Sequence, residues 1–110
     1  MSDNILYLNS ANFADEIERF NGLALVDFYA DWCGPCRMLA PIIESLAKQF
    51  VGKVKVCKIN TDEAQDISAK YQITGIPAVL IFKNGEVIDN LVGFRPIEAY
   101  QKSLNTHLAK

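Results

Sequence analysis

Two segments of the sequence, residues 23–28 and 78–82, are apolar almost without interruption. A strand with one wet face alternates apolar and polar side chains, whereas a strand covered on both faces is apolar along its length. Both segments are therefore predicted to be central strands of a sheet with helices on both sides. Asp27 is the exception, because it places a carboxyl group inside the first of these strands.

The segments around these strands alternate between strand and helix patterns. Short strands are expected over 5–8, 53–59 and 86–92, and apolar residues at helical spacing predict helices over 9–20, 33–50, 62–71 and 96–107. Asn9 or Ser10 is expected to cap the first helix, and Asn84-Gly85 predicts a hairpin turn. This order indicates an α/β fold in which a parallel half is joined to an antiparallel hairpin in one mixed sheet.

Length and charge exclude several classes of protein. A chain of 110 residues is long enough to bury one core, so we expect a single domain over 1–110. A net charge of −2 gives no reason to expect nucleic acid or an anionic membrane as a partner. No apolar stretch has the length of a membrane span, and the N-terminal residues lack a signal-peptide pattern. A cytoplasmic location is the expectation.

Cys33 and Cys36 lie where a predicted strand passes into a helix. Residues three apart on a helix have Cβ atoms roughly 5–6 Å apart, so a small adjustment brings the sulfurs within disulfide distance. The free amides and the dipole at the helix start favour a thiolate at Cys33, while Cys36 lies one turn deeper and is expected to be less accessible. Gly34 and Pro35 suit a first helical turn. The pattern predicts dithiol–disulfide exchange in which Cys33 attacks and Cys36 resolves.

Other uses of these cysteines fit less well. A structural zinc site needs four ligands, and the remaining candidates, Cys57 and His107, fall on a predicted strand interior and on the last helix. Haem attachment requires a histidine where the sequence has Arg37. A structural disulfide across so short a loop restricts the unfolded chain little. We therefore expect no metal. We expect Cys57 to be a small buried residue, and the alternative is a regulatory or dimerising thiol.

Several motifs occur in a fixed order: VDFYA, then WCGPC at 32–36, then GIPAVLIFKNG and VGF downstream. In this combination the sequence resembles the thioredoxin family along essentially the whole chain. The resemblance implies the thioredoxin fold, with a five-stranded mixed central sheet and two helices on each face in the order β-α-β-α-β-α-β-β-α. It implies a protein-disulfide reductase that works through Cys33 and Cys36, as a monomer and without a bound cofactor. The implied partners are disulfide-containing proteins and a thioredoxin reductase, either NADPH/flavin-dependent or ferredoxin-linked.

Asp27 then has a candidate role in the exchange reaction. Burial raises the pKa of a carboxyl group, so Asp27 is placed to accept the proton that Cys36 must lose, as the matching aspartate of thioredoxins does. Lys58 shares a strand face with Val54 and Val56, and Asp27 on a neighbouring strand is its candidate partner. The alternative is a buried ion pair with a purely structural role.

The resemblance also implies a substrate surface. It implies a cis Ile76–Pro77 bond beside the thiols, where an extended substrate segment pairs with the backbone of Ile76. An uncharged patch would then surround Cys33, formed by Trp32, Gly34, Pro35, Ile76, Pro77 and Gly93. The structural alternatives are a proline tolerated at a strand start, a glycine that permits a tight turn, and a tryptophan in the core.

Two further functions use the same fold or the same patch. One is a disulfide isomerase or oxidase, although the Gly-Pro pair between the cysteines favours a reductase. The other is a binding module, such as a chaperone or assembly subunit, that uses the apolar patch without redox chemistry.

Overall fold

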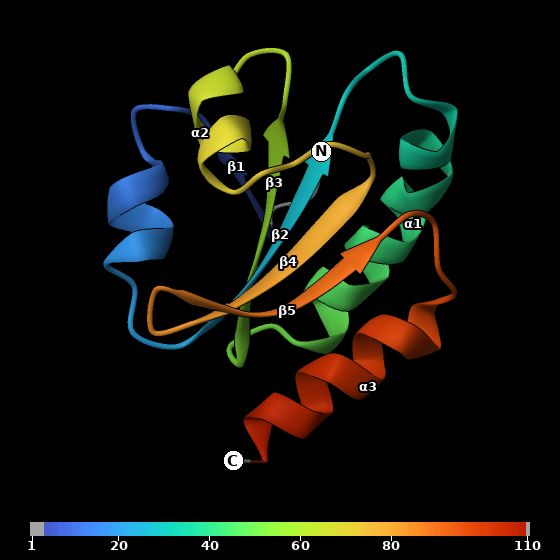
Figure 1. Cartoon of the computed structure of the whole chain (residues 1–110). Coiled ribbons are helices and arrows are strands. Elements are labelled where there is room, and N and C mark those ends of the chain that lie inside the picture. Colours follow the sequence, from blue (N-terminus) through green and yellow to red (C-terminus); the bar gives the residue numbers. More distant parts are fainter. Residues whose placement is uncertain (1–3, 110) are drawn as a thin grey trace.

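The computed structural model describes residues 4–109, and its centre is a five-stranded sheet (Figure 1). The strands are β1 (Ile5–Leu8), β2 (Leu23–Tyr29), β3 (Val54–Asn60), β4 (Ala78–Lys83) and β5 (Glu86–Val92). Their spatial order is β1-β3-β2-β4-β5. β1 and β2 run parallel to β3, while β4 is antiparallel to both β2 and β5. The predicted mixed sheet is confirmed.

Helices cover both faces of this sheet. The helical elements are η1 (Ala14–Glu18), α1 (Gly34–Gln49), α2 (Gln65–Lys70) and α3 (Ile97–Leu108). α1 and α3 lie on one face, and η1 and α2 lie on the other (Figure 1). The expected two helices on each face are therefore confirmed. None of these helices, within the part of the chain that the structure describes, has the length and hydropathy of a transmembrane span.

The two apolar segments are the middle strands, as their composition predicts. β2 is buried from residue 23 to 28, and β4 is buried from 78 to 82. Alternate side chains of each strand enter two separate cores. The core under α1 and α3 includes Leu25, Leu39, Ile43, Val79 and Leu104. The core under η1 and α2 includes Phe13, Ile17, Val26, Phe28 and Phe82.

The two helices on the η1 face are shorter than the sequence pattern predicts. Only Ala14–Glu18 of the expected segment 9–20 is regular, and it is a single π-helical stretch. The Asn9 side chain accepts hydrogen bonds from the backbone N–H groups of Ala11 and Asn12 and so caps an irregular turn that precedes η1. Ser10 has another partner, because its hydroxyl donates to Asp66. Such side-chain bonds to local backbone compete with helix formation.

The hairpin between β4 and β5 forms at the predicted turn. Asn84 and Gly85 both have positive φ angles, 52° and 84°, which is the conformation of a type I′ turn. A Cβ atom at Gly85 would meet the carbonyl oxygen of Glu18, so only glycine fits there. The Asn84 side chain accepts from the backbone N–H of Gly22 at 2.9 Å and fastens the turn to the start of β2.

Candidate active site

Cys33 and Cys36 form a disulfide at the start of α1, with 5.2 Å between their Cα atoms. Cys33 is the N-cap residue, and its backbone is extended. Its Sγ accepts a hydrogen bond from the backbone N–H of Cys36 at 3.2 Å, as a capping side chain does. Pro35 occupies the first turn, where a missing N–H costs nothing. The first turn of α1 therefore directs the Cys36 amide at the Cys33 sulfur.

Burial does not distinguish the two sulfurs in the oxidised form. Cys33 is 4% exposed and Cys36 is 3% exposed, so the expected difference in accessibility is absent while the disulfide is closed. Their surroundings differ instead. Cys33 is flanked by the exposed Trp32 and lies 3.9 Å, from Sγ to oxygen, from the carbonyl of Ile76. Cys36 borders a small cavity on the α1 side of the sheet.

Trp32 stands at the surface beside the disulfide, and not in the core. It is 68% exposed, and its indole Nε1 donates a hydrogen bond to the Asp62 carboxylate at 2.9 Å. This bond holds a large apolar side chain at the edge of the redox centre. The sequence contains no signal that pairs residue 32 with residue 62, and Asp62 was not among the predicted site residues.

The loop before β4 and the end of β5 complete the surface around Cys33. The Ile76–Pro77 peptide bond is cis, as the family resemblance implies. The backbone N–H of Gly93 donates to the Pro77 carbonyl at 2.7 Å, which ties the two segments together. Gly93 has a φ of 86°, a conformation that favours glycine. Gly93 therefore forms a turn, in addition to any contact that it makes with a substrate.

Two apolar residues beside Gly93 extend this surface and were not predicted. Val92 is 50% exposed and Phe94 is 43% exposed. A Cβ atom at Gly75 would lie 3.7 Å from a Val92 methyl group, so the end of β5 adjoins the loop that carries Ile76. The signal was present in the VGF motif, in which both neighbours of the glycine are apolar.

Asp27 is fully buried in β2, and neither oxygen of its carboxyl group has a hydrogen-bond partner among residues 4–109. Burial raises its pKa from an ordinary 3.8 to about 7, and the positive charge of Lys58 acts in the opposite direction. A buried acid that titrates near neutral pH is suited to accept and release a proton during a reaction.

Lys58 is the direct neighbour of Asp27 in the parallel pairing of β2 with β3, but the expected ion pair is not made. No salt bridge joins the two side chains among the described residues. The Lys58 ammonium instead lies 4.6 Å from the ring centroid of Tyr29, the last residue of β2. Lys58 therefore acts on Asp27 through its charge alone, without a salt bridge.

A cavity of about 160 Å³ brings the resolving cysteine and the lysine together. Cys36 enters it from α1, and Lys58 enters it from β3. The remaining lining residues are Tyr29, Ala30, Asp31, Arg37 and Ala40. The cavity therefore places the charged side chains of Asp31, Arg37 and Lys58 around the same space as Cys36.

The third cysteine is remote from this chemistry. Cys57 is fully buried in β3, and burial raises the pKa of its thiol to about 12. Its thiol therefore stays protonated at neutral pH, as expected for a small buried residue. Within residues 4–109, no three His, Cys, Asp or Glu side chains gather as a metal site requires.

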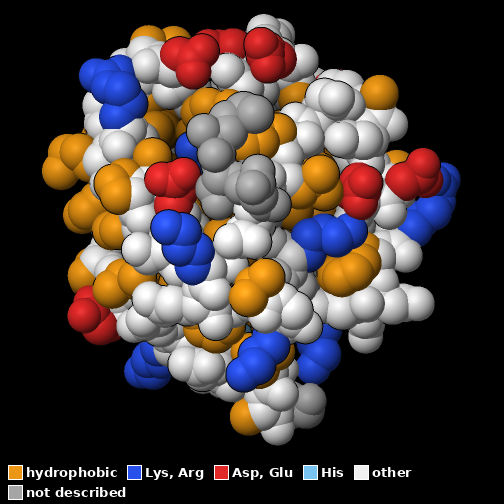
Figure 2. Space-filling view, turned by 180° about the vertical axis from the view of Figure 1, so that it is seen from behind, with side chains coloured by type: hydrophobic (Ala, Val, Ile, Leu, Met, Phe, Trp, Pro, Cys, Tyr) orange, Lys and Arg blue, Asp and Glu red, His pale blue; other side chains and the backbone are white. Residues whose placement is uncertain are grey.

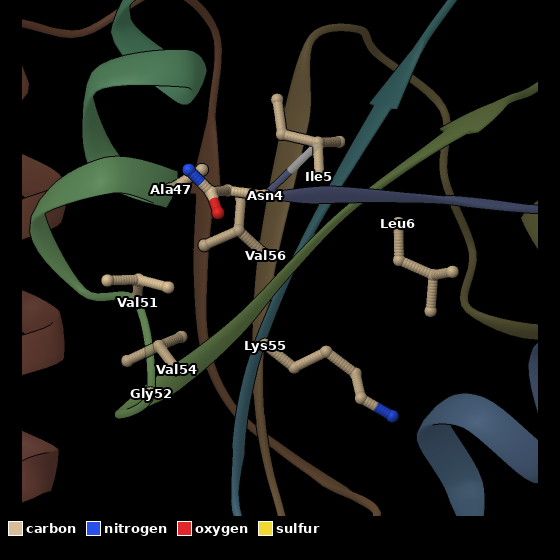
Figure 3. A pocket seen from close by; sticks show the side chains of 9 residues that line it. All are labelled: Asn4, Ile5, Leu6, Ala47, Val51, Gly52, Val54, Lys55 and Val56. Carbon is tan, nitrogen blue, oxygen red and sulfur yellow. The ribbon is translucent and has the colours of Figure 1, made fainter. Parts of the chain in front are cut away.

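A larger hollow of about 340 Å³ lies away from the disulfide, between β1 and the end of α1 (Figure 3). Its walls are mainly aliphatic, from Ile5, Ala47, Val51, Val54 and Val56. Figure 3 shows the Lys55 side chain directed toward η1, where its ammonium bonds the Glu16 carboxylate at 3.0 Å. No thiol or buried acid lines this hollow, so the disulfide region is the better candidate.

Comparison with known proteins agrees with this geometry. Residues 4–106 match the family model described as Thioredoxin. Curated thioredoxins of Staphylococcus aureus strains Mu50, MW2 and N315 are each 41% identical to the chain over 104 residues. These alignments cover 94% of this chain and 98% of each relative.

Proposed function

The chain belongs to the thioredoxin family and is a thiol–disulfide oxidoreductase that reduces protein disulfides, and on this premise we propose how its residues divide the reaction. The Cys33 thiolate attacks one sulfur of a substrate disulfide, which forms a mixed disulfide and releases one substrate thiolate. Cys36 then attacks the Cys33 sulfur and releases the second substrate thiolate. Two electrons pass to the substrate, and the enzyme is left with the Cys33–Cys36 disulfide.

One observation carries the assignment of Cys33 as the nucleophile. Its sulfur is the cap of α1 and accepts the Cys36 backbone N–H at 3.2 Å. In the reduced protein this bond and the helix dipole stabilise negative charge on Cys33. Cys36 is inside the helix, so its sulfur has no capping position.

Asp27 is proposed to accept the proton of Cys36 before the second attack. It lies in β2 on the same face of the sheet as Leu25, which is the face that α1 covers. Its two oxygens are unpartnered among residues 4–109, so they are available to a donor. The lack of an ion pair with Lys58 disfavours the purely structural alternative.

Lys58 is proposed to assist this transfer by its charge. It borders the same cavity as Cys36 and lies next to Asp27 in the sheet register. A cation at this position stabilises the carboxylate that must receive the proton and the thiolate that forms.

Protein substrates are proposed to bind at the uncharged surface around Cys33. An extended substrate segment pairs with the backbone of Ile76, whose carbonyl faces the sulfur. The surrounding surface is made of Trp32, Gly34, Pro35, Pro77 and Gly93, and we add Val92 and Phe94 on the basis of their exposure. Small apolar side chains without charge suit many different partners.

Disulfide-bearing proteins and a thioredoxin reductase are the general partners of this family. We propose that this chain takes electrons from an NADPH/flavin-dependent or a ferredoxin-linked reductase in the cytoplasm, where a reducing poise keeps the dithiol recharged. On the face shown in Figure 2, lysine and arginine side chains are scattered among acidic, apolar and uncharged ones, which supports the proposal that nucleic acid is not a partner.

We further propose that residues 1–110 form one domain and act as a monomer. Both cores pack against the same sheet, which favours a single unit. Among residues 4–109, the large exposed apolar side chains outside the disulfide region come from different elements, such as Tyr7 in β1, Val51 after α1 and Val87 in β5, which favours a monomer.

Trapping of substrates tests the proposed division of roles. A Cys36→Ser variant should accumulate mixed disulfides on Cys33 when it is incubated with a disulfide-bonded protein such as insulin. A Cys33→Ser variant is the control and should trap nothing. A binding module would retain its partners with both cysteines replaced, and an isomerase or oxidase would show a higher reduction potential against glutathione. Trapping on Cys36 in preference to Cys33 would reverse the assignment.

A further inference from the structure

A second unpartnered polar group lies in the core that contains Asp27. Tyr100 of α3 is fully buried, and its hydroxyl has no hydrogen-bond partner among residues 4–109. Buried tyrosine hydroxyls nearly always have a partner, because the desolvated O–H group is otherwise costly. Both oxygens of the Asp27 carboxyl group also lack a hydrogen-bond partner among these residues. No other buried side-chain oxygen or nitrogen of the described residues lacks a partner.

The sheet register places these groups in one layer. Asp27 is on the face of β2 that carries Leu25, and its antiparallel partner is Val79 of β4. Leu25, Val79 and Tyr100 belong to the same core cluster beneath α1 and α3. The charge of Asp27 also acts on the Tyr100 phenol, since together with burial it raises the pKa of that group. The carboxyl and hydroxyl groups therefore lie within electrostatic range in a common apolar environment.

The chemistry of the two groups is complementary. A phenol offers one O–H donor, and an ionised carboxylate only accepts. They make no direct hydrogen bond, but one water molecule between them would provide partners for the hydroxyl and for the carboxylate at once. We propose that Tyr100 is a positioning residue for Asp27, to whose carboxylate its hydroxyl donates through a single bridging water. This inference rests on the proposed role of Asp27 as the proton acceptor of Cys36.

Such a link has a consequence for catalysis. A donor to the carboxylate stabilises its charged form and opposes the effect of burial. Without it a larger fraction of Asp27 would be protonated at neutral pH and unable to accept a proton from Cys36. With it Asp27 takes the proton from the Cys36 thiol and then passes it to solvent, ready for the next cycle.

The other groups near the pair do not replace this donor. Lys58 faces Asp27 from β3 and lowers its pKa by charge alone, without a hydrogen bond. Tyr29 lies two residues after Asp27 in β2, and its ring contacts the Lys58 ammonium. The backbone N–H and the charge of Arg95, which precedes α3, favour the phenolate of Tyr100. A backbone N–H only donates, so the O–H of Tyr100 still needs an acceptor. Cys36 approaches from α1 and is the donor of the transferred proton.

The test is a Tyr100→Phe variant of the full chain, which keeps the ring and removes only the hydroxyl. We expect the carboxyl ¹³C resonance of Asp27 to titrate about one pH unit higher than in the unaltered protein, as the loss of a hydrogen bond to a charge requires. Tyr71→Phe is the matched control. It removes a hydroxyl that bonds Glu18, on the opposite face, and should leave the Asp27 midpoint unchanged. An Asp27 midpoint that is unchanged or lower in Tyr100→Phe overturns the inference.

A measurement on the unaltered protein removes any dependence on how the variant folds. The ring ¹³Cζ resonance of Tyr100 should move with the same midpoint as Asp27, and a flat profile overturns the inference. This result is separable from the proposed role of Asp27. If Asp27→Asn resolves mixed disulfides at the normal rate, the proton-acceptor role fails, while the two titrations still decide whether Tyr100 and Asp27 are linked.

Discussion

Asp27 and Lys58 face one another across β2 and β3, yet the ammonium of Lys58 lies 4.6 Å from the ring centroid of Tyr29 and makes no salt bridge with the carboxyl group. An ion pair would have held Asp27 permanently ionised. With the cation displaced, burial dominates, and the pKa of Asp27 rises to about 7. The same displacement brings Lys58 to the cavity that Cys36 borders.

The first prediction concerns stability against pH. The pKa of Asp27 is raised in the folded state, so the folded chain binds this proton more tightly than the unfolded chain, and stability falls as pH rises from about 3.8 to about 7. The cost above pH 7 is roughly 4 kcal/mol. The free energy of unfolding of Asp27→Asn should match that of the unaltered protein below pH 4 and exceed it increasingly up to pH 7. A difference that does not vary with pH would show that the raised pKa is wrong.

The second prediction concerns the resolving step. Asp27→Asn should slow the release of the mixed disulfide near neutral pH by roughly ten- to a hundredfold, because Cys36 loses its general base. Attack by Cys33 should keep its normal rate. Stopped-flow single turnovers with a disulfide peptide separate the two steps. Asp66→Asn, a change at an exposed carboxylate bonded to Ser10, is the control and should alter neither. Normal resolution by Asp27→Asn at neutral pH would remove Asp27 from the mechanism.

The third prediction concerns Lys58. Lys58→Met removes the charge that opposes burial, so the pKa of Asp27 should rise further, and the pH midpoint of the resolving step should rise with it. Lys55→Met is a matched control on the same strand, because Lys55 pairs with Glu16 and does not act on Asp27. Carboxyl NMR titration of both variants makes the comparison. Equal midpoints in the two variants would mean that Lys58 has no electrostatic part in the site.

The fourth prediction concerns thiol reactivity in the reduced protein. Iodoacetamide at mildly acidic pH should label Cys33 first, because its sulfur caps α1 and is held as a thiolate. Cys57 should stay unlabelled until the chain unfolds, since it is fully buried and its pKa is raised to about 12. Peptide mass spectrometry over time identifies the order. Earlier labelling of Cys36, or a Cys33 no faster than free cysteine, contradicts the proposed nucleophile.

The fifth prediction concerns the substrate surface. Trp32→Ala and Phe94→Ser should lower kcat/KM for a protein disulfide several-fold, because each removes exposed apolar area from the proposed substrate surface. Neither should change thermal stability much, nor the rate with a small aromatic disulfide that needs no protein contact. Val87→Ser, a change of similar exposure on the outer part of β5, is the control and should behave normally. Equal losses with both kinds of substrate would place these residues in the chemistry instead.

Local patterns in the sequence were sufficient for the elements and for the redox pair. Continuous apolar runs identified β2 and β4 as central strands, and the Asn84-Gly85 turn followed from backbone chemistry within a few residues. Cys33 and Cys36 were identifiable because their spacing on a helix is itself local. The helices predicted over 9–20 and 62–71 are longer than the observed ones. The side chains of Asn9 and Asn60 accept hydrogen bonds from nearby backbone amides, which hydrophobic spacing does not reveal.

Tertiary structure decided the polar relationships of the core. The sequence by itself determined that an acid would be buried in the strand that precedes the thiol pair, because the burial of this strand follows from the apolar residues around Asp27. In the sequence, Tyr100 is one more residue on the inner face of its helix. Only the packing of α3 against the sheet placed its hydroxyl in the core that contains Asp27. Only the tertiary structure placed the Lys58 ammonium over the Tyr29 ring and formed the hydrogen bond from the Trp32 indole to Asp62. These outcomes depend on side-chain reach across long-range contacts, which periodicity along one chain does not encode.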